Sequence, residues 1–581
     1  MRKTKIVCTL GPATDKDDVL RQLMEAGMDV ARFNFSHGDY EEHRHRLEAV
    51  KALRVELDRP VAAMLDTKGP EIRLRDFKNG KEKLVTGQTF TLTTQDVEGT
   101  NEICSITYKE LPHDVEPGGR IMLDDGLISL RVDHVTDTDI VCVVENDGNI
   151  KDKKGVNVPG VHLSMPYMSA RDKEDIVFGA KNGFDMISAS FTRCAQDIWE
   201  IRHLVEENGA HIRIIAKIEN QEGINNIDEI LSVADGIMVA RGDMGVEIDF
   251  AEIPAIQKHL IDRAMSAGKV VITATQMLDS MINNPRPTRA EITDVANAIY
   301  DGSSAVMLSG ETAAGKYPLS ALKAMIAIAE TAEADSNYGN LVHHPNIDDS
   351  RLSTSAAVAH AACTTASDIH ASAVITVSKS GETARLLSRC HPATPIIACV
   401  MDEHIRRQLN AYWGVTPLIM PYANSTDELI SMAVETAEKA GLIQSGSMVV
   451  VTAGVPVGVS GTTNMIKVHL VGDSLLTGVG IGQRNAKGKI CVCNSAAEAA
   501  QKFKPGQILV MPYSTNEMLP FMRDAAGIIT EEAGTNSHAA IVALTLNKAV
   551  IVGATNAMRT LRDGMSISMD CSHGIVQAMM E

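Results

Sequence analysis

Residues able to hold a metal ion and a phosphate group come at the ends of short apolar runs. Glu219 ends the run 214–220 and Asp243 ends the run 236–243. Two carboxylates, completed by water and substrate oxygens, suit Mg²⁺. Lys217 comes two residues before Glu219, and side chains alternate along a strand, so both would lie on one face. An ammonium group beside a metal ion is suited to phosphoryl transfer.

Further polar residues follow other apolar runs of the same kind. Arg32 and Arg73 offer guanidinium groups, whose forked donors fit phosphate oxygens. Polar groups at most of the run ends favour one shared site over isolated helix caps or salt bridges. The residues at these ends are Arg32, Asn34, Asp66, Lys217, Glu219, Arg241, Asp243, Thr275, Gln276 and Glu311.

A repeated pattern positions these residues: a short apolar run, a polar cluster, then an amphipathic helix. The pattern predicts parallel strands covered by helices, and eight repeats predict a closed (β/α)8 barrel, an α/β fold. Active sites of such barrels lie at the carboxyl ends of the strands. The predicted strands lie in 5–10, 29–35, 61–67, 185–191, 214–220, 236–243, 270–276 and 305–311.

The rest of the chain predicts three more domains. An insertion after the third run has alternating strands and tight turns, as in a small β-barrel, and a βα loop would carry it over the site as a lid. A linker is expected at 337–350, before a second α/β pattern. The predicted domains are the catalytic barrel in 1–69 and 170–340, the lid in 70–169, an α/β domain in 350–473 and a C-terminal extension in 488–581.

Composition excludes several classes of partner. The chain has 581 residues with 55 basic and 74 acidic side chains, a net charge of −19, so neither nucleic acid nor an anionic membrane is an expected partner. Ten scattered cysteines without a CxxC pair favour free thiols in a reducing compartment. No signal peptide and no membrane-spanning run is expected. These features predict a soluble cytoplasmic protein.

Eight sequence strings resemble those of pyruvate kinases and follow the family's order. They are TLGPAT near the start, ARFNFSHG (31–38), MLDTKGPEIR (64–73), KIENQEG (217–223), MVARGDMG (238–245), TATQML (273–278), PRPTRAEITDVANAI (285–299) and LSGETAAGKYP (308–318). The predicted domain arrangement is also similar. The resemblance implies transfer of the phosphoryl group of phosphoenolpyruvate to ADP, giving pyruvate and ATP in glycolysis, and a homotetramer in the cytoplasm.

The resemblance assigns roles in catalysis and substrate binding. It implies that Lys217 stabilises the phosphoryl group, that Arg32 binds it, and that Thr275 helps to deliver the proton that completes pyruvate. It implies Mg²⁺ (or Mn²⁺) at Glu219 and Asp243. The implied substrate site consists of Arg32, Lys217, Gly242, Asp243 and Thr275, with backbone amides of Gly242 and Asp243 at the substrate carboxylate.

The resemblance also implies a nucleotide site and a K⁺ site. Expected nucleotide contacts are Asn34, His37, Arg73 and Arg171. At Arg171 the family commonly has a lysine, so the charge is kept on a different side chain. Expected K⁺ ligands are Asn34, Ser36, Asp66 and Thr67, all oxygen donors. A glutamate at the position of Glu71 accompanies K⁺ dependence in the family, so K⁺ is expected to be required.

A loop in the second α/β domain predicts an effector site. In TVSKSGETAR (376–385), serine and glycine residues come between a strand and a helix, where backbone amides bind phosphate. The phosphate contacts are expected from Ser378, Lys379, Ser380 and Thr383. Since the family binds phosphorylated activators here, activation by a sugar phosphate or AMP is expected; an ordinary capped loop is the alternative.

Residues 531–557 resemble the phosphohistidine domain of phosphoenolpyruvate-utilising enzymes, with His538 at the phosphorylated position. The usual glycine pair is Ala533–Gly534, and Asn536 replaces a threonine. No ATP-grasp module, which loads the histidine in those enzymes, is recognised before it. The extension is therefore expected to have a structural or subunit-contact role.

Three other functions remain open from the residues alone. GETAAGKY (310–317) is close to a P-loop, but Tyr317 cannot supply the hydroxyl that binds magnesium there. A carbon–carbon lyase of the aldolase type would also use a glutamate–aspartate magnesium site, although it has no need of Lys217 or a nucleotide lid. A binding-only regulator would not need Lys217, Glu219 and Asp243 together.

Overall fold

The computed structural model describes residues 2–335, 338, 353–422, 425–454, 463–472, 474–482 and 484–579. All of the predicted linker at 337–350 except Tyr338 lies outside the described residues. The chain separates into two compact units, one of Met1–Thr436 with Val450–Lys467 and one of Ala437–Val449 with Val468–Glu581.

Eight parallel strands close into a barrel, which confirms the predicted fold class. Each strand is almost entirely buried, because its outer face lies under helices and its inner face fills the barrel. The last strand, β17, pairs with the first, β1, and closes the barrel. In barrel order the strands are β1 (Lys5–Thr9), β2 (Val30–Asn34), β3 (Ala62–Asp66), β13 (Met186–Ala189), β14 (Arg213–Ile218), β15 (Gly236–Ala240), β16 (Val270–Ala274) and β17 (Ala305–Leu308).

Helices connect successive strands of the barrel. Capping boxes fix the starts of two of them, with Ser169 and Asp172 at α4 and Thr288 and Glu291 at α10. The helices are α1 (Val19–Ala26), α2 (Tyr40–Leu57), α4 (Ala170–Asn182), α5 (Ala195–Glu207), α6 (Gln221–Asn225), α7 (Ile227–Val233), α8 (Arg241–Glu247), α9 (Ile253–Ser266), α10 (Arg289–Tyr300), α11 (Gly310–Ala313) and α12 (Pro318–Glu333), with the 3-10 turn η1 (Asp279–Ile282).

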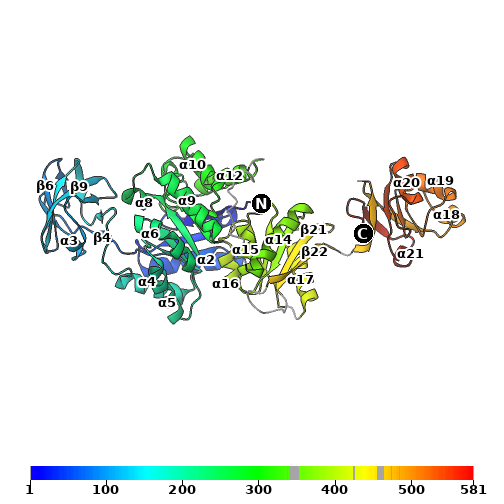
Figure 1. The fold of residues 1–581 in the computed structure, drawn as a ribbon, viewed down its shortest axis with the longest axis horizontal. Coiled ribbons are helices and arrows are strands. Elements are labelled where there is room, and N and C mark those ends of the chain that lie inside the picture. The colour runs from blue at the N-terminus through cyan, green and yellow to red at the C-terminus, as the bar shows by residue number, and fades with distance from the viewer. Residues whose placement is uncertain are drawn as a thin grey trace. The chain divides into compact units, whose positions relative to one another are not determined.

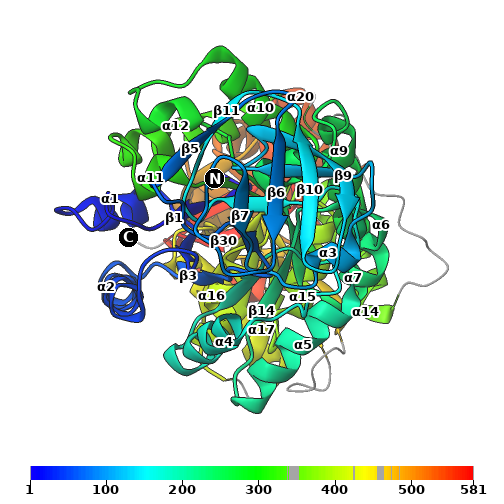
Figure 2. The same ribbon diagram turned by 90° about the vertical axis from the view of Figure 1, so that its left-hand side faces the viewer.

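The segment between β3 and β13 folds into a separate β-structure. Side chains of β10 alternate between buried and half-buried, as expected of a strand with one face on a core. Strands β6, β9 and β10 lie side by side in Figure 2. The main sheet has the order β4 (Ile72–Arg73), β12 (Gly155–Asn157), β8 (Arg120–Leu123), β9 (Ile128–Val135), β10 (Asp139–Val144), β6 (Thr89–Thr93) and β7 (Ile103–Ser105); β5 (Lys81–Leu84) pairs with β11 (Gly148–Lys151), and α3 (Leu111–Asp114) is the short helix.

A five-stranded sheet forms the second α/β layer. Its order is β20 (Val415–Ile419), β19 (Ile396–Val400), β18 (Ala373–Val377), β21 (Met448–Gly454) and β22 (Thr463–Leu470). Strands β18, β19 and β20 are parallel, and helices connect them. The helices of this layer are α14 (Thr354–Asp368), α15 (Glu382–Arg389), α16 (Glu403–Leu409) and α17 (Thr426–Lys439), labelled in Figure 1.

The second unit contains an eight-stranded mixed sheet with its own apolar clusters. Its order is β23 (Ser474–Thr477), β30 (Ile575–Ala578), β29 (Ser566–Asp570), β25 (Ala486–Val492), β26 (Ile508–Met511), β27 (Gly527–Thr530), β28 (Ala549–Val552) and β24 (Val479–Ile481). Its helices are α18 (Ala496–Lys502), the 3-10 turn η3 (Asn516–Met518), α19 (Leu519–Asp524), α20 (His538–Leu546) and α21 (Ala557–Thr560). Throughout the described chain, no helix has the length and apolar character needed to cross a bilayer.

Candidate active site

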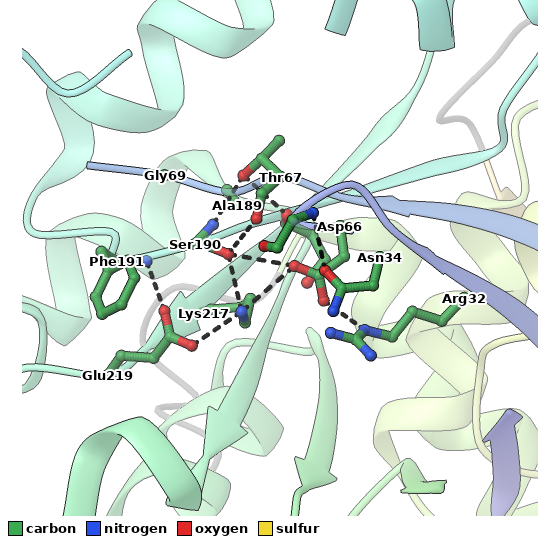
Figure 3. A network of polar contacts seen from close by, with 12 residues as sticks. Arg32, Asn34, Asp66, Thr67, Gly69, Ala189, Ser190, Phe191, Lys217 and Glu219 are labelled. Atoms are coloured by element: carbon green, nitrogen blue, oxygen red, sulfur yellow. Dashed lines mark hydrogen bonds and ion pairs between the residues drawn. The ribbon is translucent and has the colours of Figure 1, made fainter. Parts of the chain in front are cut away.

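Lys217 lies at the centre of a polar network at the carboxyl ends of the barrel strands. Its Nζ is 2.9 Å from Glu219 Oε1 and 3.3 Å from Asp66 Oδ1, and it donates a hydrogen bond of 2.8 Å to Ser190 Oγ. Figure 3 shows these groups converging on the ammonium. Burial alone would lower the pKa of Lys217, but the two carboxylates raise it above its ordinary value. Lys217 is therefore a fixed cation rather than a base.

Asp66 connects Lys217 to Arg32 on the neighbouring strand β2. Arg32 Nε donates to Asp66 Oδ2 at 2.5 Å, and Arg32 Nη1 donates to Thr9 Oγ1 at 3.0 Å. Burial alone would raise the pKa of Asp66, but Arg32 and Lys217 hold it below its usual value. Asp66 thus holds the Arg32 guanidinium and the Lys217 ammonium close together. Two neighbouring cations can attract the oxygens of a phosphoryl group.

The end of β13 contributes two residues that the sequence patterns did not single out. Ser190 donates to the carbonyl of Thr67 at 2.6 Å and to Asp66 Oδ1 at 3.2 Å. The backbone N–H of Phe191 donates to Glu219 Oε2 at 2.6 Å, with Phe191 at φ 53°. The only sequence signal was the position of both residues at the end of the run 185–191, the same criterion that identified the other candidates.

Glu219 and Asp243 make up the predicted magnesium site. Glu219 is fully buried, and burial, reinforced by the charge of Asp243, raises the pKa of Glu219 to about 8 against the opposing effect of Lys217. A cation between two such carboxylates would favour their charged forms. Among the described residues no group of three His, Cys, Asp or Glu side chains forms a complete metal site. Two carboxylates fit Mg²⁺, which keeps water and substrate oxygens as further ligands.

Thr275 and Gly242 are brought into direct contact at the ends of β16 and β15. The amide of Gly242 donates to Thr275 Oγ1 at 2.8 Å, and this hydroxyl donates to the carbonyl of Ala274 at 2.6 Å. A substrate carboxylate at Gly242 would have to replace the hydroxyl. Thr275 has φ 70°, which is strained for a β-branched residue. Arg241 Nη2 donates to the Thr275 carbonyl at 2.8 Å and helps to hold this conformation.

The expected K⁺ ligands lie along β2 and β3 and the loops that follow. Asn34 is paired with Asp66 in the barrel register, and the amide of Ser36 donates to Asn34 Oδ1 at 3.1 Å. Thr67 Oγ1 accepts from the amide of Ser190 at 3.1 Å. All of these groups offer oxygen, as a hard alkali cation requires. Glu71 lies nearby in sequence and is paired with Arg73 and Lys68 at 2.5 and 3.5 Å.

The residues predicted to contact the nucleotide do not form one connected network like that around Lys217. Arg73 Nη1 donates to the carbonyl of Lys153 at 2.7 Å, within the lid. Arg171 Nε is 3.0 Å from Asp175 Oδ1, and its guanidinium lies 4.2 Å from the ring centroid of Tyr40. These contacts are outside the Lys217 network. His37 is exposed, and its carbonyl contacts His43 Nε2 at 2.9 Å.

A cavity of about 400 Å³ lies between the barrel and the lid. It reaches the site through Phe191 and Asp243 and is lined on the lid side by residues such as Asn157. Asn157 Nδ2 donates to Glu247 Oε1 at 3.0 Å, and His162 Nδ1 contacts Glu222 Oε2 at 3.1 Å. Of the predicted magnesium pair, Asp243 lines this cavity, whereas Glu219 is fully buried.

The predicted effector loop precedes α15. Ser378 and Thr383 are buried, and Lys379 is exposed. Thr383 Oγ1 is 2.5 Å from Thr463 Oγ1 on β22. Gly381 has φ 79°, a left-handed conformation that glycine adopts without strain. The loop therefore places hydroxyls, an ammonium and the first amides of a helix close together.

In the second unit, His538 begins α20. Its Nδ1 lies 2.8 Å from Ser514 Oγ and its Nε2 lies 3.1 Å from Asn516 Oδ1. Both ring nitrogens thus have side-chain partners. Ser537 caps the helix by accepting from the amide of Ala540.

Family models match three parts of the chain. Residues 1–322 match "Pyruvate kinase, barrel domain", residues 356–469 match "Pyruvate kinase, alpha/beta domain", and residues 503–574 match "PEP-utilising enzyme, mobile domain". Together these matches cover the barrel with its lid, the second α/β layer and most of the second unit.

Relatives that match almost the whole chain carry the same family name. A pyruvate kinase of Geobacillus stearothermophilus is 50% identical over 99% of this chain and 98% of its own, and one of Sporosarcina psychrophila is 48% identical over 99% of each. A crystal structure of a pyruvate kinase from Cryptosporidium parvum superimposes with a TM-score of 0.75 at 38% identity, covering 81% of this chain and 96% of the other. The chain belongs to the pyruvate kinase family.

Proposed function

We propose that this chain transfers the phosphoryl group of phosphoenolpyruvate to ADP, giving ATP and pyruvate. The observation that carries the proposal is the Lys217 ammonium, held by Asp66, Glu219 and Ser190 beside the Arg32 guanidinium. The bond from phosphorus to the enol oxygen breaks while a bond from phosphorus to an oxygen of ADP forms. The enolate then takes up a proton at its terminal carbon.

Each residue has a defined part in this chemistry. Lys217 and Arg32 hold the equatorial oxygens of the phosphoryl group and stabilise their charge during transfer. Thr275 orients the proton donor at the enolate, and the amides of Gly242 and Asp243 hold the carboxylate. Glu219 and Asp243 would hold Mg²⁺ or Mn²⁺, which supplies positive charge to the substrate oxygens.

Pyruvate kinases as a family generally depend on Mg²⁺ and K⁺. We propose that Asn34, Ser36, Asp66 and Thr67 bind K⁺, and that Glu71 makes the ion necessary. We also propose that Asn34, His37, Arg73 and Arg171 contact the nucleotide. For Arg73 and Arg171 this requires each guanidinium to exchange its present carboxylate partner, Glu71 or Asp175, for phosphate oxygens.

A sugar phosphate or AMP is the proposed activator at Ser378, Lys379, Ser380 and Thr383. The support is the grouping of hydroxyls and a lysine at the start of α15. The test is a titration of AMP and glucose 6-phosphate against activity at low phosphoenolpyruvate. Unchanged potency when Ser380 and Thr383 are both replaced by alanine would place the activator elsewhere.

We further propose four domains with the boundaries expected from the sequence, except that the C-terminal extension begins before β23 rather than at residue 488, because β23, β24 and the first residues of β25 belong to its sheet. We also propose a structural or subunit-contact role for the extension, and a homotetramer in the cytoplasm. The support for a reducing compartment is the scattered spacing of the ten cysteines, without a CxxC pair. The partners of His538 on both ring nitrogens support a structural role.

A coupled assay tests the main activity. Phosphoenolpyruvate, ADP, Mg²⁺ and K⁺ should give pyruvate and ATP in equal amounts, and omission of ADP should abolish pyruvate formation. Pyruvate formed without ADP, or release of pyruvate from a longer oxo acid, would favour the lyase alternative. No turnover with intact nucleotide binding would favour a regulator.

A further inference from the structure

A fully buried carboxylate joins the barrel to the second α/β layer. Asp185 comes directly before β13, and none of its side chain is exposed. Its Oδ2 accepts from Arg54 Nη2 at 2.9 Å and from the amide of Ala63 at 2.8 Å, both within the barrel. Its Oδ1 accepts from Arg407 Nε at 2.8 Å and contacts His404 Nδ1 at 3.1 Å, both on α16. A buried charge with so many partners has one favourable position.

Helix α16 makes a second contact with the barrel beside Asp185. Gln408 Nε2 donates to the carbonyl of His211 at 2.9 Å and to that of Asp185 at 3.3 Å. His404 Nε2 lies 2.8 Å from the same His211 carbonyl. Burial alone would raise the pKa of Asp185, but His404 and the two arginines hold it below its ordinary value, so the joint is ionic. One face of α16 is therefore fixed to the barrel.

Another part of α16 packs directly against the effector loop. At Gly381 an added Cβ would lie 2.9 Å from Leu409 Cδ2 and 3.4 Å from Ile405 Cγ2. The loop and the helix are thus in close van der Waals contact with no space for a side chain. Since packed interiors transmit displacement, a shift of the loop at Gly381 would displace Leu409 and α16.

Strand β13 leads from Asp185 to the phosphoryl-transfer site. Asp185 precedes the strand, and Ser190 and Phe191 follow it. Because a strand rises about 3.3 Å per residue, these ends are roughly 17 Å apart. Pairing with β3 and β14 on its two sides keeps β13 straight and stiff. At its far end Ser190 contacts Lys217 and the amide of Phe191 contacts Glu219.

We propose that Asp185 is a positioning residue through which the effector loop acts on the active site. The connection runs from the loop to α16, from α16 to Asp185, and along β13 to Ser190 and Phe191. The activator favours the state in which these two residues align Lys217 and Glu219 for phosphoenolpyruvate and Mg²⁺. The proposal rests on the proposed activity and deepens its proposed regulation.

A double-mutant cycle tests the connection without any activator. Gly381→Ala strains the loop backbone, because φ is 79°, and presses the new Cβ on Leu409 of α16. Arg407→Met removes a link between α16 and Asp185. Gly381→Ala alone should change the apparent constant for phosphoenolpyruvate at least about threefold. Mutations between coupled sites change the coupling free energy by roughly 0.5–2 kcal/mol, and threefold lies within that range. In the Arg407→Met background the same change should be less than about 1.5-fold, with kcat at saturating substrate altered less than about twofold in either case.

Arg406→Met is the matched control, because Arg406 also links α16 to the barrel. It pairs with Asp58 at 2.8 Å and makes no contact with Asp185 among the described interactions. The effect of Gly381→Ala should persist in this background. Equal effects of Gly381→Ala in all three backgrounds, or no effect in the otherwise unchanged chain, would overturn the proposal. A thermal melt of Arg407→Met shows whether this variant is folded. Arg407→Lys keeps the positive charge beside Asp185 and should restore part of the coupling.

Titration with AMP and glucose 6-phosphate separates this proposal from the proposed regulation. If either probe binds and activates, Arg407→Met should retain binding, seen as a thermal shift, and lose most of the activation. Activation of Arg407→Met equal to that of the unchanged chain would overturn the connection. If neither probe binds, the activator proposal fails, and the double-mutant cycle still decides whether Asp185 connects the loop to the site.

Discussion

At the scale of single residues, the site is defined by how it holds its cations. Lys217 has three oxygen partners, and Arg32 shares one of them, Asp66. Neither side chain can relax away without leaving a buried carboxylate with fewer partners, which is costly. The two cations are therefore in place before a substrate arrives, which removes reorganisation from the transfer step.

Lys217→Met should lower kcat at least about 100-fold, because one cation at the phosphoryl oxygens is lost. Glu219 and Asp243 remain, so Mn²⁺ binding measured by electron paramagnetic resonance should change less than about threefold. Lys51→Met, at a partly exposed lysine of α2 paired with Glu48, is the control and should keep normal turnover. Near-normal turnover of Lys217→Met would exclude the role proposed for this residue.

Glu71→Lys should reduce the dependence of activity on K⁺. The introduced ammonium can replace the charge of the ion, although it also meets Arg73 and Lys68, the present partners of Glu71. The measurement is the ratio of kcat with and without K⁺ at constant ionic strength. Glu71→Gln removes the carboxylate without adding a cation and should stay dependent on K⁺. The same ratio in Glu71→Lys as in the unchanged chain would contradict the assignment.

At the scale of elements, the eight barrel strands were predictable because both of their faces are buried. Each appears in the sequence as a largely apolar run, and seven of the eight runs contain the whole strand found in the structure, whereas β14 begins one residue before its run, at Arg213. The sequence did not predict that residues after β13 contact Lys217 and Glu219. Ser190 acts through a hydroxyl and Phe191 through its backbone amide, and a backbone donor has no signature in residue type.

The partners of Arg73 and Arg171 were not predicted from the sequence, although the spacing of Arg171 and Asp175 on a helix permits an ion pair. Arg171 is four residues before Asp175 on α4, and its guanidinium stacks on Tyr40 of α2. Which of several nearby acceptors a long side chain selects depends on tertiary packing. Motif matches identified the residue type at these positions but not its partner.

The contact between α16 and the barrel should make stability depend on pH. The hydrogen bond with Asp185 raises the pKa of His404 above its ordinary value, against the effects of burial and of Arg407. A raised pKa in the folded state means that this contribution is complete below about pH 6.5, the unfolded value, and is lost as the pH rises through the folded value.

The test compares His404→Gln with the unchanged chain in urea unfolding from pH 5.5 to 9. The unchanged chain should be more stable by about 1–3 kcal/mol at low pH, and the difference should shrink as the pH rises. His203→Gln on α5, where the imidazole is largely exposed, should have a small effect at every pH. A difference for His404→Gln that grows with pH would mean that His404 is neutral in the folded protein.

At the scale of the whole molecule, the two units have separate cores, and the Lys217 network lies entirely within the first. A cut at the predicted start of the C-terminal extension, residue 488, would pass through β25 and leave β23 and β24 without their partners β30 and β28. A cut at residue 473 removes all eight strands of this sheet together.

Removal of residues 473–581 should leave transfer from phosphoenolpyruvate to ADP within about fivefold of the full chain, with a change in stability or activator response. His538→Ala in the full chain should leave kcat unaffected, because both ring nitrogens serve hydrogen bonds. The coupled assay measures kcat, and mass spectrometry after incubation with phosphoenolpyruvate detects any phosphate on His538. Phosphate on His538, together with activity lost in His538→Ala, would show that the extension takes part in the chemistry.

The pairing of β1 with β17 also determines how long β1 lacks one of its partners during synthesis. Partners in this pair, such as Lys5 and Ala305, are about 300 residues apart in sequence. At about 5–20 residues per second, the ribosome needs roughly 15–60 s to deliver the second strand after the first. During that time one edge of β1, a strand that is wholly buried in the folded protein, has no partner and is open to pairing with other chains. The yield of active protein should therefore depend on what shields the nascent chain during that interval.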